Sequence, residues 1–177
     1  MSIISRLLDR SIVFSFDRTG YGRHEKEFLP HDPPDDLSGL HVVITGANSG
    51  IGYATAAALV SRNAKVTLVC RSSSRGQAAL ASLREETPHA RVDLALADLS
   101  DMTSVRTLAA QLTEPIHALV HNAGNMLDEL SYTDDGIEEI TALHVVGPYM
   151  LSRALMDNLA AGAAQSHGRI IFVASGG

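Results

Sequence analysis

The chain has 177 residues, 45% hydrophobic and 19% charged, a composition typical of one globular domain with a buried core. Its net charge of -6 argues against a nucleic-acid-binding surface. Cys70 is the single cysteine, which excludes an intramolecular disulfide and a zinc site built on cysteines. No apolar run approaches the roughly 18 residues that a transmembrane helix needs. We therefore expect a cytoplasmic protein.

The first 38 residues are expected to be an extension that precedes the domain. Apolar residues recur three and four positions apart over residues 1–16, which predicts a short amphipathic helix. This helix could dock on its own domain, on a partner or, peripherally, on a membrane surface. Residues 18–38 are rich in glycine, proline and charge, so we expect the domain to span residues 39–177.

From Gly39 onward, short β-rich runs alternate with helical runs. The predicted strands are His41–Thr45, Lys65–Cys70, Arg91–Ala97, Ile116–His121 and Arg169–Ala174. The predicted helices are Ile51–Arg62, Ser74–Glu86, Met102–Leu112 and Gly136–Ala161. This alternation predicts an α/β fold, a doubly wound Rossmann-type parallel sheet of about five strands with helices on both faces.

A glycine-rich turn, residues 45–52, joins the first predicted strand to the first predicted helix. Gly46 suits a tight turn, Gly50 would let backbone approach a pyrophosphate, and Gly52 would let the helix pack close to the sheet. The absence of a following Lys-Ser or Lys-Thr excludes a P-loop. The alternative is a strand-helix turn that binds nothing.

The spacing G-x-x-x-G-x-G resembles the short-chain dehydrogenase/reductase family, above all its NADP-linked retinol-dehydrogenase-like and orphan members. Asp98-Leu99 is similar to the family's adenine-side pair, residues 122–124 to the end of its N-N-A-G, and Ser175 to its catalytic serine. The resemblance covers residues 40–177. It implies a dinucleotide site made by Gly46, Asn48, Ser49, Gly50, Ile51, Gly52, Arg71, Asp98, Leu99, Asn122, Ala123 and Gly124.

These motifs follow the carboxyl ends of the predicted strands, where open α/β sheets bind ligands. Two of them have local alternatives. Asp98 could cap the helix that begins near Met102, and Asn122 could form a loop hydrogen bond to backbone.

The residue after the second strand bears on the choice of cofactor. A carboxylate there accepts hydrogen bonds from the ribose of NAD, whereas a 2′-phosphate needs a cation. Arg71 stands at this place and Arg75 follows closely, so NADP(H) is favoured over NAD(H). The alternative for Arg71 is a solvated loop arginine.

The catalytic set that the resemblance implies is incomplete. The family's Tyr-x-x-x-Lys does not occur in the chain, which suggests a C-terminally truncated portion of a longer enzyme. His144 stands where the family has asparagine, three residues before Gly147, on a predicted apolar stripe that would turn it inward toward the sheet. It would either organise a proton-relay water or be a core histidine. Pro148 should kink this helix.

The sequence therefore predicts the cofactor-binding portion of an oxidoreductase that moves hydride between an alcohol and a carbonyl. Ser175 and His144 are the candidate catalytic residues. The expected partners are a dinucleotide, a small alcohol or carbonyl substrate if the site is completed, and a second copy in a homo-oligomer. Catalytically inactive nucleotide binding, or an interaction fragment, is the alternative. No metal site is expected.

Overall fold

The computed structural model describes residue 22 and residues 34–164 and 168–174. The predicted helix over residues 1–16 and the candidate catalytic residue Ser175 lie outside these ranges. The chain divides into two units, Met1–Asp35 and Asp36–Gly177, and the second carries every strand and helix discussed below.

Five parallel strands form one sheet in the order β3-β2-β1-β4-β5. They are β1 (His41–Thr45), β2 (Lys65–Cys70), β3 (Arg91–Leu96), β4 (Ala118–His121) and β5 (Arg169–Phe172). The bounds of β1 and β2 match the prediction residue for residue. The predicted fourth strand begins two residues too early, and the backbone N–H of Ile116 there donates to the carbonyl of Asn158 instead of entering the sheet.

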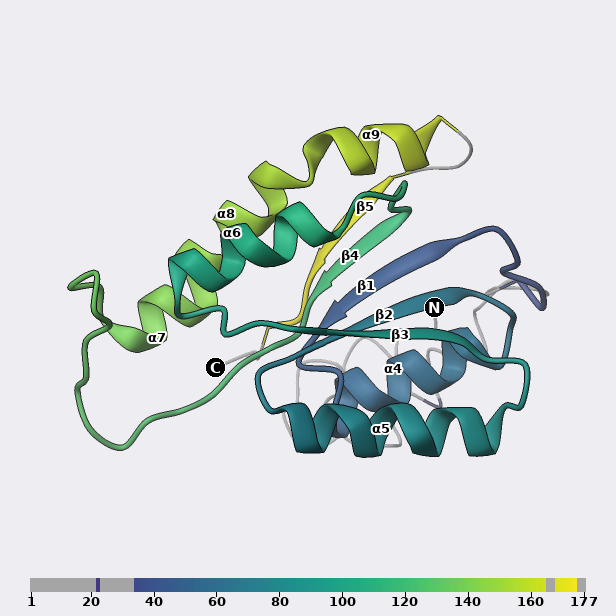
Figure 1. The fold of residues 1–177 in the computed structure, drawn as a ribbon, viewed down its shortest axis with the longest axis horizontal. Coiled ribbons are helices and arrows are strands. Elements are labelled where there is room, and N and C mark those ends of the chain that lie inside the picture. The colour runs from purple at the N-terminus through teal and green to yellow at the C-terminus, as the bar shows by residue number, and fades with distance from the viewer. Residues whose placement is uncertain (1–21, 23–33, 165–167, 175–177) are drawn as a thin grey trace, which may run out of the picture. The chain divides into compact units, whose positions relative to one another are not determined.

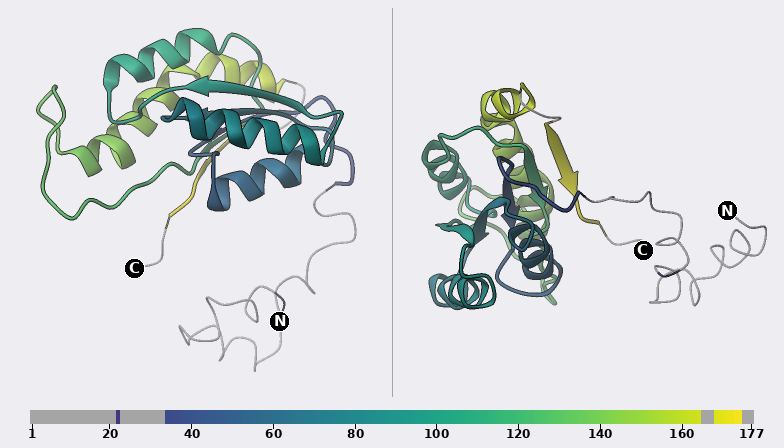
Figure 2. Two further views of the ribbon diagram at one scale, coloured as in Figure 1. Left: turned by 60° about the horizontal axis from the view of Figure 1, so that its bottom comes forward. Right: turned by 90° about the vertical axis from the view of Figure 1, so that its right-hand side faces the viewer.

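Helices cover both faces of the sheet, as predicted (Figure 1). One layer holds α4 (Gly50–Val60) and α5 (Ser73–Glu86), and the other holds α6 (Met102–Gln111), α8 (Gly147–Ala154) and α9 (Met156–Ala163). Figure 2 shows the sheet between the two layers. The fold is therefore a doubly wound, Rossmann-like α/β domain.

Strand β1 is buried along its whole length and apolar at its three central positions. Val42 and Ile44 pack in the core cluster shared with α4 and α5, whereas Val43 packs in the cluster shared with α6 and α8. Successive side chains of a strand point to opposite faces, so the centre of a strand covered on both faces is apolar at successive positions.

The predicted long helix from Gly136 to Ala161 is interrupted in the structure. Its residues form a single turn α7 (Glu139–Thr141), a π-helical turn η2 (Ala142–Val146), then α8 and α9, which meet at Leu155. A kink was expected at Pro148, and the structure shows a π-turn directly before it, in which the Gly147 N–H donates to the Ala142 carbonyl five residues earlier.

Candidate cofactor-binding site

The glycine turn after β1 is held by close backbone packing. Gly46 has a φ of +66°, and a Cβ atom there would lie 2.7 Å from the Cα of Ala123. A Cβ atom on Gly52 would lie 2.5 Å from Asn122 Nδ2 and 2.6 Å from the Gly46 carbonyl oxygen. Gly50 has a φ of +55° and nothing within 4 Å of such a Cβ. Gly46 and Gly52 therefore shape the turn, while Gly50 leaves open space beside it.

Helix α4 begins at this turn with an unsatisfied amino end. Ser49 is its N-cap residue, but the Ser49 side chain makes no capping hydrogen bond, and the first turn carries no acidic residue. The first backbone N–H groups of a helix lack internal partners and carry partial positive charge. This end of α4 is therefore suited to an anion such as a pyrophosphate.

Asn122 ties the end of β4 to the end of β1. Its Nδ2 donates to the carbonyl oxygens of Thr45 at 3.0 Å and Gly46 at 3.2 Å. The backbone N–H groups of Asn122 and Ala123 both donate to Thr45 Oγ1 at 3.0 Å. The structure thus shows for Asn122 the backbone hydrogen bond that was its local alternative, and these bonds fix the glycine turn.

Asp98 belongs to the loop between β3 and α6, and it does not cap that helix. Asp101 is the N-cap residue, since its carboxylate accepts from the N–H groups of Thr103 at 2.8 Å and Ser104 at 3.2 Å. The capping alternative for Asp98 is therefore wrong. The Asp98 carboxylate instead accepts from the backbone and hydroxyl of Ser100, at 2.9 and 2.6 Å.

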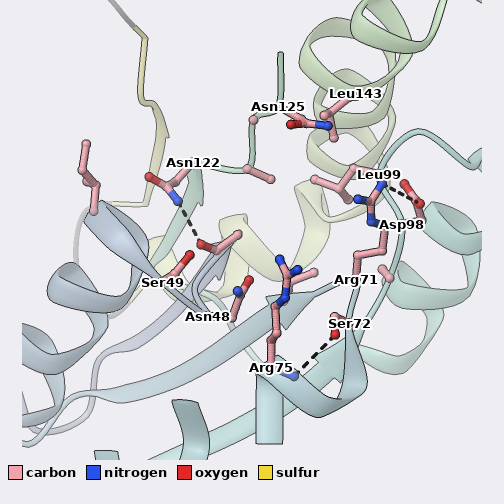
Figure 3. Close-up of a pocket in the computed structure, with 16 residues that line it drawn as sticks. Asn48, Ser49, Arg71, Ser72, Arg75, Asp98, Leu99, Asn122, Asn125 and Leu143 are labelled. Carbon is pink, nitrogen blue, oxygen red and sulfur yellow. Dashed lines mark hydrogen bonds and ion pairs between the residues drawn. The ribbon is translucent and has the colours of Figure 1, made fainter. Parts of the chain in front are cut away.

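Two arginines extend from the end of β2 into the same region (Figure 3). Arg71 Nη1 lies 3.6 Å from Asp98 Oδ2 in an ion pair, and both side chains retain solvent exposure, 63% and 32%. Arg75 lies in the first turn of α5, and its backbone N–H donates to the hydroxyl of Ser72, the N-cap residue. Arg71 is thus an exposed loop residue paired with a carboxylate, which fits both the cofactor role and the solvated-loop alternative.

These groups surround a cavity of about 490 Å³ at the carboxyl ends of the strands (Figure 3). All of the predicted cofactor residues except Gly50 and Gly52 line it. The lining is formed by Gly46, Asn48, Ser49, Ile51, Val69, Arg71, Ser72, Arg75, Ala97, Asp98, Leu99, Asn122, Ala123, Gly124, Asn125 and Leu143.

Sequence reasoning did not single out five of these residues, Val69, Ser72, Ala97, Asn125 and Leu143. Ser72 could have been predicted, because serine is a typical N-cap residue and Ser72 directly precedes helix α5, where its side chain accepts from the Arg75 N–H. Asn125 follows the Asn-Ala-Gly motif directly, so chain continuity was the available signal. Nothing in the sequence placed Leu143, because its direction depends on the π-turn.

His144 is exposed, so the prediction that it points inward toward the sheet is wrong, and so is the core-histidine alternative. The π-turn breaks the 3.6-residue period on which the predicted apolar stripe depended. His144 Nε2 lies 3.2 Å from the backbone nitrogen and 3.1 Å from the carbonyl oxygen of Asn125, at one end of the cavity. Its catalytic role stays a prediction.

No described tyrosine lines the cavity. Tyr53 donates its hydroxyl hydrogen to Glu86 Oε1 at 2.8 Å, and Tyr132 and Tyr149 are exposed on other surfaces. Among the described residues there is no cluster of metal-ligating side chains, and no described helix is long and apolar enough to span a membrane.

The family profile described as short chain dehydrogenase matches residues 40–177. The chain belongs to the short-chain dehydrogenase/reductase family. The family binds a dinucleotide of the NAD(P)(H) type, which agrees with the cavity described above.

Individual short-chain dehydrogenases/reductases are similar over most of this chain. The human dehydrogenase/reductase SDR family member 12 is 32% identical over 96% of the chain and 55% of its own length. Human retinol dehydrogenase 12 is 38% identical over 70% of the chain and 40% of its own length. The chain thus spans about half the length of these relatives.

A solved structure shows the same likeness in three dimensions. The short-chain dehydrogenase from Sphingobium yanoikuyae in complex with NADPH is 30% identical, with a TM-score of 0.64 over 77% of this chain and 54% of that one.

Proposed function

We propose that the chain is the cofactor-binding portion of an NADP(H)-dependent oxidoreductase that transfers hydride between an alcohol and a carbonyl. The observation that carries the cofactor choice is the pair of arginines, Arg71 and Arg75, that line the cavity at the end of β2. A 2′-phosphate needs a cation there, whereas a free ribose 2′-hydroxyl needs a carboxylate. The similar Sphingobium enzyme in complex with NADPH supports the same choice.

The carboxylate in the cavity strengthens this argument. Asp98 is the one acidic residue among the described residues that line the cavity. Its two oxygens are already engaged, by Ser100 and by Arg71. Asp98 follows β3, whereas the carboxylate that accepts from the ribose of NAD(H) follows the second strand, where this chain has Arg71. Among the described residues Arg75 has no ion-pair partner, so its charge is available to a phosphate.

The proposed chemistry divides between cofactor and protein. The nicotinamide, when bound, supplies or accepts the hydride. The amino end of α4 would hold the pyrophosphate, and Ser175 would donate a hydrogen bond to the substrate oxygen as negative charge develops on it. A proton donor is also required, and the chain has no Tyr-x-x-x-Lys to provide it.

The alternative is a dinucleotide-binding module without catalysis, which would use the same cavity. The reading frame beyond the codon for Gly177 separates the two proposals. A continuation that encodes Tyr-x-x-x-Lys supports the enzyme, and a stop codon supports the module. A cytoplasmic location stays a prediction, which cell fractionation would test.

The cofactor choice is tested by titrating the chain with NADPH and NADH. We expect tighter binding of NADPH, and Arg71→Asp should shift the preference toward NADH, because an introduced carboxylate repels a 2′-phosphate and accepts from a 2′-hydroxyl. Arg106→Asp, which makes the same charge change on an exposed residue outside the cavity, is the control. Equal or tighter binding of NADH by the unmodified chain would refute the proposal.

A further inference from the structure

The π-turn η2 and the residue that follows it touch two separate loops of the cavity. Leu143 lines the cavity itself, and His144 Nε2 lies 3.2 Å from the backbone nitrogen of Asn125, in the loop after β4. At the end of the turn, Gly147 lies directly against Leu99, in the loop after β3. A single turn of helix therefore contacts both loops.

The contact at Gly147 leaves no room for a side chain. A Cβ atom on Gly147 would overlap the carbonyl oxygen of Leu99 and would lie 3.1 Å from its carbonyl carbon. Both are backbone atoms, so the overlap cannot be relieved by rotating a side chain. The Leu99 loop would have to move, and Leu99 is only 4% exposed and packed in the core.

Movement of Leu99 would disturb the arginine end of the cavity. Leu99 lines the cavity and is bonded directly to Asp98, the carboxylate that orients Arg71 at 3.6 Å. The loop is otherwise held by short hydrogen bonds, including the one that the backbone N–H of Asp98 donates to Ser104 Oγ at 3.0 Å. A displacement of Leu99 would therefore move the Asp98 carboxylate and change the position of Arg71, which pairs with it.

The π-turn determines which residue meets the Leu99 carbonyl. The Gly147 N–H donates to the Ala142 carbonyl, five residues earlier instead of four, so the turn holds one residue more than an α-helical turn. This extra residue allows Leu143 to face the cavity, His144 to reach Asn125, and Gly147 to lie on Leu99. Pro148, which has no N–H to donate, disfavours a return to regular α-helical hydrogen bonding.

We propose that Gly147 is a positioning residue for the adenine side of the dinucleotide site, acting through Leu99 and Asp98, and that the π-turn couples this side to the Asn125 loop. The inference rests on the proposed function, because it assigns the Asp98–Leu99 loop to the adenine half of NADP(H).

The test compares two glycines with the same steric constraint in different places. A Cβ atom on Gly162, in α9, would likewise overlap a backbone carbonyl oxygen, that of Ile116, but neither residue lines the cavity. Gly147→Ala and Gly162→Ala in the full chain are titrated with NADPH and with adenosine 2′,5′-bisphosphate, which is the adenine half alone. Thermal unfolding followed by circular dichroism gives the folded fraction of each variant.

For Gly147→Ala we expect both probes to bind about tenfold more weakly, equivalent to about 1.4 kcal/mol, because the damage lies on the adenine side. Gly162→Ala should lower the melting temperature. At temperatures where this variant is folded, both dissociation constants should stay within about twofold of those of the unmodified chain. Unchanged binding by Gly147→Ala, or equal losses in the two variants, would overturn the inference.

His144→Ala keeps the inference testable if Gly147→Ala does not fold. The side chain is exposed, so its removal leaves the core intact, and it frees only the Asn125 loop. NADPH should then lose affinity, and the bisphosphate should lose affinity as well, because the π-turn couples the Asn125 loop to the adenine side. An unchanged affinity for the bisphosphate would overturn the coupling through the π-turn. A lack of binding by the unmodified chain would instead refute the proposed function itself.

Discussion

Burial of one imidazole, that of His121, makes the stability of the domain sensitive to acid. The residue is 5% exposed, stacks on Phe172 with ring centroids 4.8 Å apart, and shares a 2.8 Å hydrogen bond between Nε2 and Ser152 Oγ. Its Nδ1 has no partner among the described residues. Burial lowers the pKa of His121 to about 4 from an ordinary 6.5, because the charged form loses its hydration.

The pH dependence follows from this lowered pKa. Below pH 6.5 the unfolded chain takes up a proton at His121, and the folded chain does not until about pH 4. Stability is therefore present above pH 6.5 and is lost as the pH falls toward 4, by about 3 kcal/mol. His121→Asn should flatten this part of the profile in urea unfolding series. Burial also lowers the pKa of His41, so a smaller slope should persist. An unchanged slope would contradict the assignment.

The glycine turn gives a second prediction at the scale of single residues. Gly52→Val should lower the free energy of unfolding by roughly 3 kcal/mol or more, because its side chain would overlap Asn122 and the Gly46 carbonyl. Gly50→Val adds its side chain in open space, at a cost of about 1–2 kcal/mol for the left-handed backbone. It should therefore lose NADPH affinity while the chain still folds. Retained affinity would mean that Gly50 serves only the turn.

At the scale of one element, two carboxylates near the start of helix α6 should have different roles. Asp101 caps the helix, and Asp98 pairs with Arg71 in the cavity. Asp101→Ala removes the N-cap hydrogen bonds to Thr103 and Ser104, and should lower the free energy of unfolding by about 1 kcal/mol without changing NADPH affinity. Asp98→Ala frees Arg71 and should weaken NADPH binding. Chemical unfolding and fluorescence titration measure the two effects. Weaker NADPH binding by Asp101→Ala, with unchanged binding by Asp98→Ala, would contradict these two roles.

At the scale of the whole molecule, strand β5 is one of the two edge strands of the described sheet, and β3 is the other. Four successive apolar residues at the β5 edge are between 38% and 60% exposed: Ile170, Ile171, Phe172 and Val173. An apolar strand with unpaired backbone groups is a template for pairing with another chain. Among the described residues β5 therefore presents exposed apolar side chains, and self-association stays a prediction.

Light scattering during size-exclusion chromatography tests that prediction. The unmodified chain should form concentration-dependent oligomers or aggregates, and Ile171→Lys should reduce them, because a charge on an edge strand opposes pairing. The same preparation should show no dehydrogenase turnover with NADPH and aldehydes, since the chain lacks a Tyr-x-x-x-Lys. A monodisperse, active monomer would contradict both expectations.

The sequence by itself determined the fold class, the bounds of β1 and β2, and most of the residues that line the cavity. These features depend on local signals, namely apolar runs, helix spacing and glycines placed at the end of a strand. The identity of the N-cap of α6 was not determined in this way, because Asp98 and Asp101 are both plausible by type and position. Only their hydrogen bonds to Ser100 and Thr103 distinguish them.

The tertiary structure alone decided which groups meet across the cavity. The ion pair of Arg71 with Asp98 and the bonds of Asn122 to Thr45 and Gly46 join residues far apart in the chain, so no local pattern contains them. The exposure of His144 was likewise missed, because helix-period reasoning assumes 3.6 residues per turn throughout. The π-turn before Gly147 adds one residue and changes the direction of every side chain within it.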